Sequence, residues 1–109
     1  MLDRMVYTRN SPRYPLIVAA EVTELSSGVT LNGRSSDVSR TGCYIDTLNP
    51  VPAGSQIRVR LSHEQGVFET QARVVYISPG LGMGVAFVDP AANQIALLDR
   101  WLADAAKNQ

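Results

Sequence analysis

Apolar and polar side chains alternate without interruption along residues 57–62. The apolar members are Ile57, Val59 and Leu61, and the polar members between them are Arg58, Arg60 and Ser62. Successive side chains of a β-strand point to opposite faces, so a period of two indicates a strand with one dry and one wet face. The chain therefore builds at least part of its core from a half-buried sheet.

The same period recurs in five other short segments. These strands are predicted at residues 16–23, from residue 29 onward, at 43–48, at 68–76 and at 83–87. In the segment 68–76 the alternating residues are Phe68, Thr70, Ala72, Val74 and Tyr76. Turns are predicted at 26–28, 49–54, 63–66 and 78–80, and a polar loop at 37–42. Six short strands joined in this way favour an antiparallel barrel or sandwich.

The period becomes helical only near the end of the chain. Asp89 is placed to act as an N-cap, with Pro90 at the first helical position. The apolar residues then fall three and four apart, at Ile95, Leu98, Leu102 and Ala105. This spacing predicts a helix from about residue 90 with one apolar face. Trp101 flanks that face, and we interpret it as a core residue ahead of the alternative, a contact with a partner.

Length and charge exclude several classes of protein. A chain of 109 residues is enough for one core, and ten basic residues balance ten acidic ones. The zero net charge argues against a generally basic nucleic-acid binder. One cysteine and one histidine, Cys43 and His63, exclude a disulfide framework and a Cys/His metal cage. No apolar run is long enough for a membrane span or a signal peptide, so we expect a cytoplasmic protein.

Residues 1–14 differ from the rest in charge: they contain three arginines, Arg4, Arg9 and Arg13, and only one acidic residue. Pro12 and Pro15 disfavour a helix and push their neighbours toward extended conformations. We therefore divide the chain into a flexible basic arm, residues 1–14, and a barrel with its helix, residues 15–109.

Two short patterns carry the chemistry. Arg9 and Arg13 stand four apart on the arm, and Asp37, Ser39 and Gly42 form an Asp-x-Ser-x-x-Gly pattern between two strands. Either pattern alone has a plain explanation: the arginines as solvated charges, and the second set as turn residues. Both patterns together, in this order, are informative.

With both motifs the chain resembles the PilZ domain family of bacterial cyclic di-GMP receptors. That family is marked by Arg-x-x-x-Arg before the first strand and Asp/Asn-x-Ser-x-x-Gly after the second. The resemblance extends from about Thr8 to Trp101. It implies a six-stranded antiparallel β-barrel, a C-terminal helix and cyclic di-GMP bound outside the barrel. Many members have another arginine where this chain has Thr8, so the number of ligands bound stays open.

The residue types suit this ligand. A guanidinium pairs with phosphate, binds the O6 and N7 acceptors of guanine or stacks on its ring, which gives Arg9 and Arg13 their expected roles. Asp37 can accept the N–H donors of guanine, and Ser39 offers a hydroxyl beside it. Gly42 allows a positive φ or a close approach of the backbone. Among the other residues, Cys43 is expected in the core and His63 in solvent. Gly82 and Gly84 are expected to allow close strand packing.

The sequence thus predicts a cyclic di-GMP receptor whose arm becomes ordered on binding and signals to a downstream protein. The alternative is a ligand-independent adaptor of the same family that acts through protein contacts. We expect no enzymatic activity, because no nucleophile–base pair or metal set can be assembled, and no cofactor apart from the ligand. Nucleic acid and membrane insertion are not expected. The downstream pathway and the oligomeric state are left open, a homodimer included.

Overall fold

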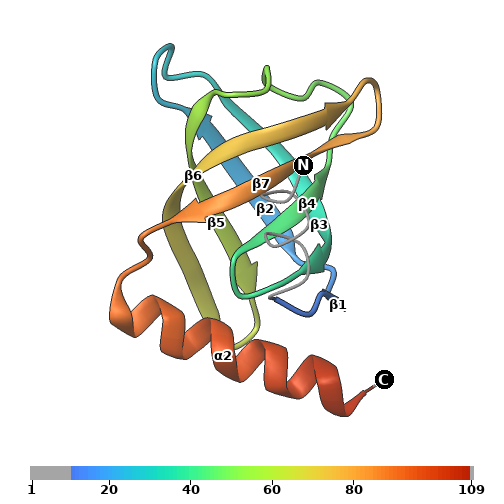
Figure 1. Cartoon of the computed structure of the whole chain (residues 1–109), viewed down its shortest axis with the longest axis vertical. Coiled ribbons are helices and arrows are strands. Elements are labelled where there is room, and N and C mark those ends of the chain that lie inside the picture. Colours follow the sequence, from blue (N-terminus) through green and yellow to red (C-terminus); the bar gives the residue numbers. More distant parts are fainter. Residues whose placement is uncertain (1–10, 109) are drawn as a thin grey trace.

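A computed structural model describes residues 11–108 as a closed barrel with one helix packed against it (Figure 1). The elements are β1 (Tyr14–Pro15), β2 (Ala19–Glu24), β3 (Thr30–Val38), β4 (Gly42–Asp46), β5 (Gln56–His63), β6 (Gly66–Ser78), β7 (Gly82–Val88) and α2 (Ala92–Lys107). The strands pair in the order β3-β2-β5-β6-β7-β4, and β4 pairs again with β3. All pairings are antiparallel. The six-stranded barrel with a C-terminal helix is therefore confirmed, and the short β1 adds a two-residue pairing to β3.

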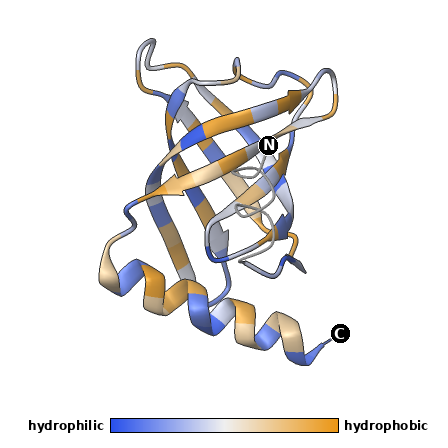
Figure 2. Cartoon of the chain, in the orientation of Figure 1, coloured by the Kyte–Doolittle hydropathy of each residue, from blue (hydrophilic) through white to orange (hydrophobic). Residues whose placement is uncertain are grey.

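The alternation in the sequence separates the core from solvent as expected. Ile57, Val59 and Leu61 of β5 are fully buried, while the residues between them are exposed. Figure 2 shows the same alternation of hydrophobic and hydrophilic residues along the strands. The inward side chains form one cluster with the buried face of α2. Burial of this apolar surface is the main source of the barrel's stability.

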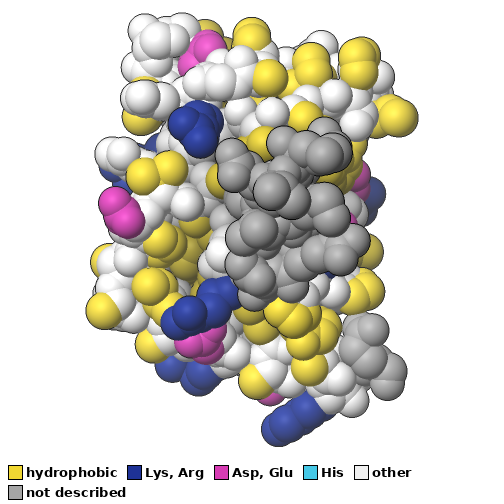
Figure 3. Space-filling view, viewed as in Figure 1, with side chains coloured by type: hydrophobic (Ala, Val, Ile, Leu, Met, Phe, Trp, Pro, Cys, Tyr) yellow, Lys and Arg dark blue, Asp and Glu magenta, His cyan; other side chains and the backbone are white. Residues whose placement is uncertain are grey.

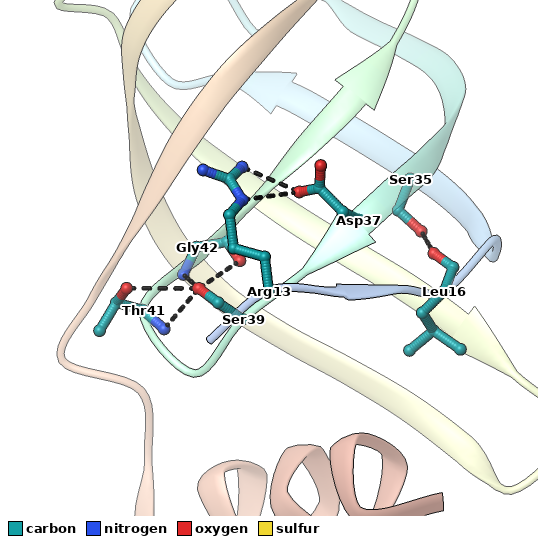
Figure 4. Close-up of polar contacts among 7 residues, drawn as sticks. All are labelled: Arg13, Leu16, Ser35, Asp37, Ser39, Thr41 and Gly42. Atoms are coloured by element: carbon teal, nitrogen blue, oxygen red, sulfur yellow. Dashed lines mark hydrogen bonds and ion pairs between the residues drawn. The ribbon is translucent and has the colours of Figure 1, made fainter. Parts of the chain in front are cut away.

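The first long strand begins later than predicted, at Ala19, because a buried serine replaces part of its ladder. Ser35 Oγ accepts a hydrogen bond from the Val18 backbone N–H at 3.0 Å and donates one to the Leu16 carbonyl at 2.6 Å (Figure 4). These bonds satisfy the Val18 N–H and the Leu16 carbonyl, while the Leu16 N–H donates to the Ser36 carbonyl and the Val18 carbonyl accepts from the Ser35 N–H. The second strand in turn runs further than expected, so Asp37 lies at the end of β3 and the loop is confined to residues 39–41.

Two β-bulges interrupt the period of two. The register of β3 against β4 shifts between Ser35 and Asp37, and that of β6 against β7 shifts between Val74 and Tyr76. An extra residue in one strand turns the following side chains to the opposite face. Ser35 is therefore buried while Asp37 is partly exposed, and Val74 is buried while Tyr76 faces solvent. Tyr76 lies in the predicted strand, but for this reason it does not share the buried face of Phe68, Ala72 and Val74.

The start of α2 also differs from the prediction. Asp89 does not cap the helix: it takes a left-handed turn (φ 45°) directly after β7, and Ala91 is the N-cap residue. Ala91 has no side-chain acceptor, and the first turn carries no acidic residue. The helix is instead tied to the barrel by Gln94, whose Oε1 accepts a hydrogen bond from the Glu69 backbone N–H at 2.6 Å.

The apolar face of α2 closes one end of the barrel, as Figure 1 shows. Its buried residues are Leu97, Leu98, Trp101, Leu102 and Ala105. Trp101 is confirmed as a core residue, with 1% of its surface exposed and its ring at the edge of Phe68. His63 stacks on the Trp101 ring at 5.0 Å and is partly buried, so the expectation that it points into solvent was wrong.

Docking of α2 depends on Trp101, and its removal is expected to be costly. Trp101→Ala should lower the free energy of unfolding by about 3–5 kcal/mol, because it deletes a large buried ring and leaves a cavity. Ala103→Ser, at an exposed position of the same helix, is the control and should change stability by less than about 0.5 kcal/mol. Urea unfolding followed by circular dichroism measures both, and equal stabilities would contradict the proposed packing role.

Candidate functional site

A tight loop between β3 and β4 holds the second sequence motif, and Ser39 fixes its shape. Ser39 Oγ accepts hydrogen bonds from the backbone N–H groups of Thr41 at 3.2 Å and Gly42 at 3.1 Å (Figure 4). The Ser39 backbone N–H donates to the Gly42 carbonyl at 2.8 Å. Only 4% of Ser39 is exposed. Its hydroxyl thus satisfies loop backbone groups that have no strand partner.

Beside this loop, Arg13 and Asp37 form an ion pair. Arg13 Nε donates a hydrogen bond to Asp37 Oδ1 at 3.0 Å, and Arg13 Nη2 lies 2.8 Å from the same oxygen. Figure 4 shows the guanidinium turned toward the carboxylate across the strand ends. Both side chains are about one-third exposed, so solvent weakens the attraction and the pair contributes little to stability. Its consequence is positional: it brings together one charged residue from each motif.

These residues border a narrow hollow on the outside of the barrel. Its lining includes Ser11, Arg13, Ser39, Gly42, Tyr76 and Gly84. The enclosed volume is about 10 Å³, which is room for about one water molecule. A nucleotide-sized ligand therefore cannot enter the hollow and would have to lie across the surface above it.

An aromatic wall beside the hollow was not foreseen from the sequence. The rings of Tyr76 and Tyr44 lie 6.1 Å apart, and each packs over a glycine of β7. A Cβ atom at Gly84 would clash with the Tyr76 ring, and one at Gly82 would clash with the Ile45 carbonyl and the Tyr44 ring. The expectation that these glycines allow close packing is confirmed. The Gly-x-Gly spacing was visible in the sequence, but the bulge that brings Tyr76 over Gly84 was not.

The predicted site residues thus have different outcomes. Arg13, Asp37, Ser39 and Gly42 lie together at one end of β3 and β4, whereas Arg9 lies outside the described residues. Gly42 is buried at the start of β4 and does not have a positive φ, so of its two expected roles only the close approach of the backbone to the ligand is left as a prediction. Arg40, inside the motif, points away and donates a hydrogen bond from Nε to Asp99 Oδ1 of α2 at 3.1 Å.

Cys43 borders the hollow from the core side. It is 1% exposed, as expected for a small apolar residue. Burial, and secondly the nearby charge of Asp37, raises the pKa of its thiol from 9.0 to about 12. The thiol is therefore protonated at neutral pH and is a poor nucleophile. Across the described residues, no group of three or more His, Cys, Asp or Glu side chains could hold a metal ion.

The raised pKa of Cys43 predicts a loss of stability in alkali. The unfolded chain releases the thiol proton above pH 9.0 while the folded chain retains it up to about pH 12, so unfolding becomes easier as the pH rises between those values. We expect a loss of about 1 kcal/mol per pH unit relative to Cys43→Ala. Urea unfolding of both proteins from pH 7 to 11 measures the difference. Parallel stability curves would contradict the assigned pKa.

Comparison with known proteins places these features in context. The family model of the PilZ domain matches residues 7–104. None of the curated proteins matches the chain in sequence. No helix in the described part of the chain has the length and apolar character to cross a bilayer.

Several solved structures share the fold. The PilZ domain of YcgR from Escherichia coli, solved with c-di-GMP, has a TM-score of 0.76 and 18% identity over 92% of each chain. The Bacillus subtilis inhibitor of motility, MotI, has a TM-score of 0.78 and 17% identity over 94% of this chain and 53% of its own. The PilZ domain of CeSA from a cellulose-synthesizing bacterium has a TM-score of 0.67 and 19% identity over 84% of this chain and 94% of its own. At these identities the likeness shows the fold alone.

Proposed function

The chain belongs to the PilZ domain family, and from this premise we propose that it is a receptor for cyclic di-GMP. The observation that carries the proposal is the contact of Arg13, from the first motif, with Asp37, from the second, on one outer face beside the loop of Ser39 and Gly42. The receptor is not an enzyme and uses no cofactor; cyclic di-GMP is its ligand.

Arg13 and Asp37 are assigned the direct contacts. The guanidinium of Arg13 pairs with a phosphate or with the O6 and N7 acceptors of guanine. The carboxylate of Asp37 accepts the N–H donors on the other edge of the base. In the structure each satisfies the charge of the other, so the ligand must replace their mutual hydrogen bonds with its own. The partial exposure of the pair keeps the cost of this exchange low.

Ser39 and Gly42 are assigned to hold the loop in a fixed shape for the ligand. The Ser39 hydroxyl is already engaged by two backbone N–H groups, which supports a role in positioning the loop beside any direct contact. Tyr76 adds a stacking surface for a purine, because its ring borders the same hollow and is 45% exposed. Binding then needs little rearrangement of the barrel, which limits its entropic cost.

The output is proposed to come from the arm, residues 1–14. Arg13 already contacts Asp37 of the barrel, so a ligand bound there that is also held by Arg9, four residues earlier, would tie the arm to the barrel. Binding energy then offsets the conformational entropy lost by the arm, and the ordered arm presents a new surface to a downstream protein in the cytoplasm. A ligand-independent adaptor would present its partner surface without this ordering of the arm.

Calorimetric titration with cyclic di-GMP tests the receptor function. We expect binding that Arg13→Ala weakens at least tenfold, because a charge-assisted hydrogen bond contributes about 1.5–3 kcal/mol. Arg58→Ala, an exposed arginine on the outer face of β5, is the matched control and should bind like the wild type. GTP should give no comparable heat. Absence of binding by a folded wild-type protein would favour the adaptor instead, and the stoichiometry would give one ligand or two.

Limited trypsin digestion tests the role of the arm. We expect cyclic di-GMP to slow cleavage after Arg4 and Arg9 severalfold in the wild type, because an ordered segment is a poor protease substrate. Asp37→Ala, which lacks a proposed ligand contact, should lose this protection at the same ligand concentration. Equal cleavage rates with and without bound ligand would overturn the ordering of the arm while leaving ligand binding intact.

A further inference from the structure

A second surface, distinct from the hollow, lies at the end of the barrel away from α2. It is a groove of about 790 Å³ whose lining includes Arg34, Tyr44, Asp46, Leu48, Gly80 and Leu81. In this Leu48–Leu81 groove, Leu48 is 80% exposed and Leu81 is 70% exposed. Figure 3 shows hydrophobic side chains gathered at this end of the molecule. Exposed apolar clusters of this kind mark interaction sites on globular proteins.

The two leucines are held in place by the backbone. The Thr47 backbone N–H donates to the Leu81 carbonyl at 3.0 Å, which joins the β4–β5 connection to the β6–β7 turn. The Leu81 backbone N–H in turn donates to the Ser78 carbonyl at 2.9 Å. The backbone at Leu81 and at Thr47, the neighbour of Leu48, is thus held by hydrogen bonds, while both leucine side chains are exposed. Such a preorganised surface loses little entropy when it binds.

Two opposite charges lie next to each other in the lining of the groove, together with the leucines. Arg34 of β3 and Asp46 of β4 are register partners, and both are exposed. Within residues 11–108, neither side chain forms an ion pair or a hydrogen bond. Elsewhere on the barrel, Arg58 and Arg60 of β5 do form ion pairs with Glu69 of the neighbouring strand β6. The groove therefore presents one cation and one anion available to a partner.

An apolar patch beside one cation and one anion complements itself under a two-fold rotation. In an isologous contact, Arg34 of each copy meets Asp46 of the other next to the two-fold axis, and the leucines of the two copies pack beside these two ion pairs. We propose that the Leu48–Leu81 groove is the interface of a homodimer of this chain. The dimer does not require cyclic di-GMP, so its test is independent of the test of the proposed receptor function.

Sedimentation velocity without ligand tests the dimer. Between about 10 μM and about 1 mM, the wild type should shift from the mass of one chain, 11.8 kDa, toward twice that mass. Leu48→Ser combined with Leu81→Ser should weaken association at least tenfold. These leucines are exposed, so thermal unfolding should show that the variant remains folded. A wild type that stays monomeric throughout, or a dimer that survives both substitutions, overturns the proposal.

Charge-reversal variants distinguish association with a second copy of this chain from association with any other partner. Arg34→Glu alone and Asp46→Arg alone should each weaken self-association at least tenfold, because like charges then meet across the two-fold axis. An equimolar mixture of the two variants should recover association, since each can pair with the other. Arg100→Glu, on the exposed face of α2, is the control and should dimerise like the wild type. Failure of the mixture to associate would overturn the two-fold arrangement.

Discussion

Pairing of β3 with β4 is the contact on which the molecule depends. It closes the sheet, so the inward side chains of six strands share one core. The same pairing places the loop of Ser39 and Gly42 at the point of closure. The loop's shape is therefore fixed by the barrel as well as by its own hydrogen bonds, and the ion pair of Arg13 and Asp37 is built on a strand that cannot slip without opening the core.

The two β-bulges then decide which chemistry the outside of the barrel carries. Without the bulge in β3, Asp37 would lie on the same face as the buried Ser35, and without the bulge in β6, Tyr76 would follow Val74 inward. Both irregularities turn a candidate ligand contact outward on the strands next to the hollow. The cost is local, because each affects one ladder position, while the gain is one carboxylate and one aromatic ring on the outer face.

Regular features were therefore predictable and irregular ones were not. The alternation at Ile57, Val59 and Leu61 gave the correct buried face because nothing interrupts β5. The ends of β2 and β3 were misplaced because Ser35 supplies backbone hydrogen bonds through its side chain, which a periodic pattern does not reveal. Asp89 had the residue type of a helix cap but lies in a left-handed turn. The motif containing Asp37 was recognisable in the sequence. The position of Tyr76 beside it was not, because that position depends on a strand register that only the structure shows.

The weak start of α2 has a consequence for the order of folding. A helix whose N-cap residue Ala91 offers no side-chain acceptor gains little from its N-terminal end, and its stability comes mainly from the surface it covers. That surface exists only after Phe68 and the neighbouring strand residues have come together, through pairings between segments distant in the sequence. Such long-range pairing is the slow part of folding. We therefore expect the helix to dock late, on a barrel that has already closed, and to detach early when the protein opens.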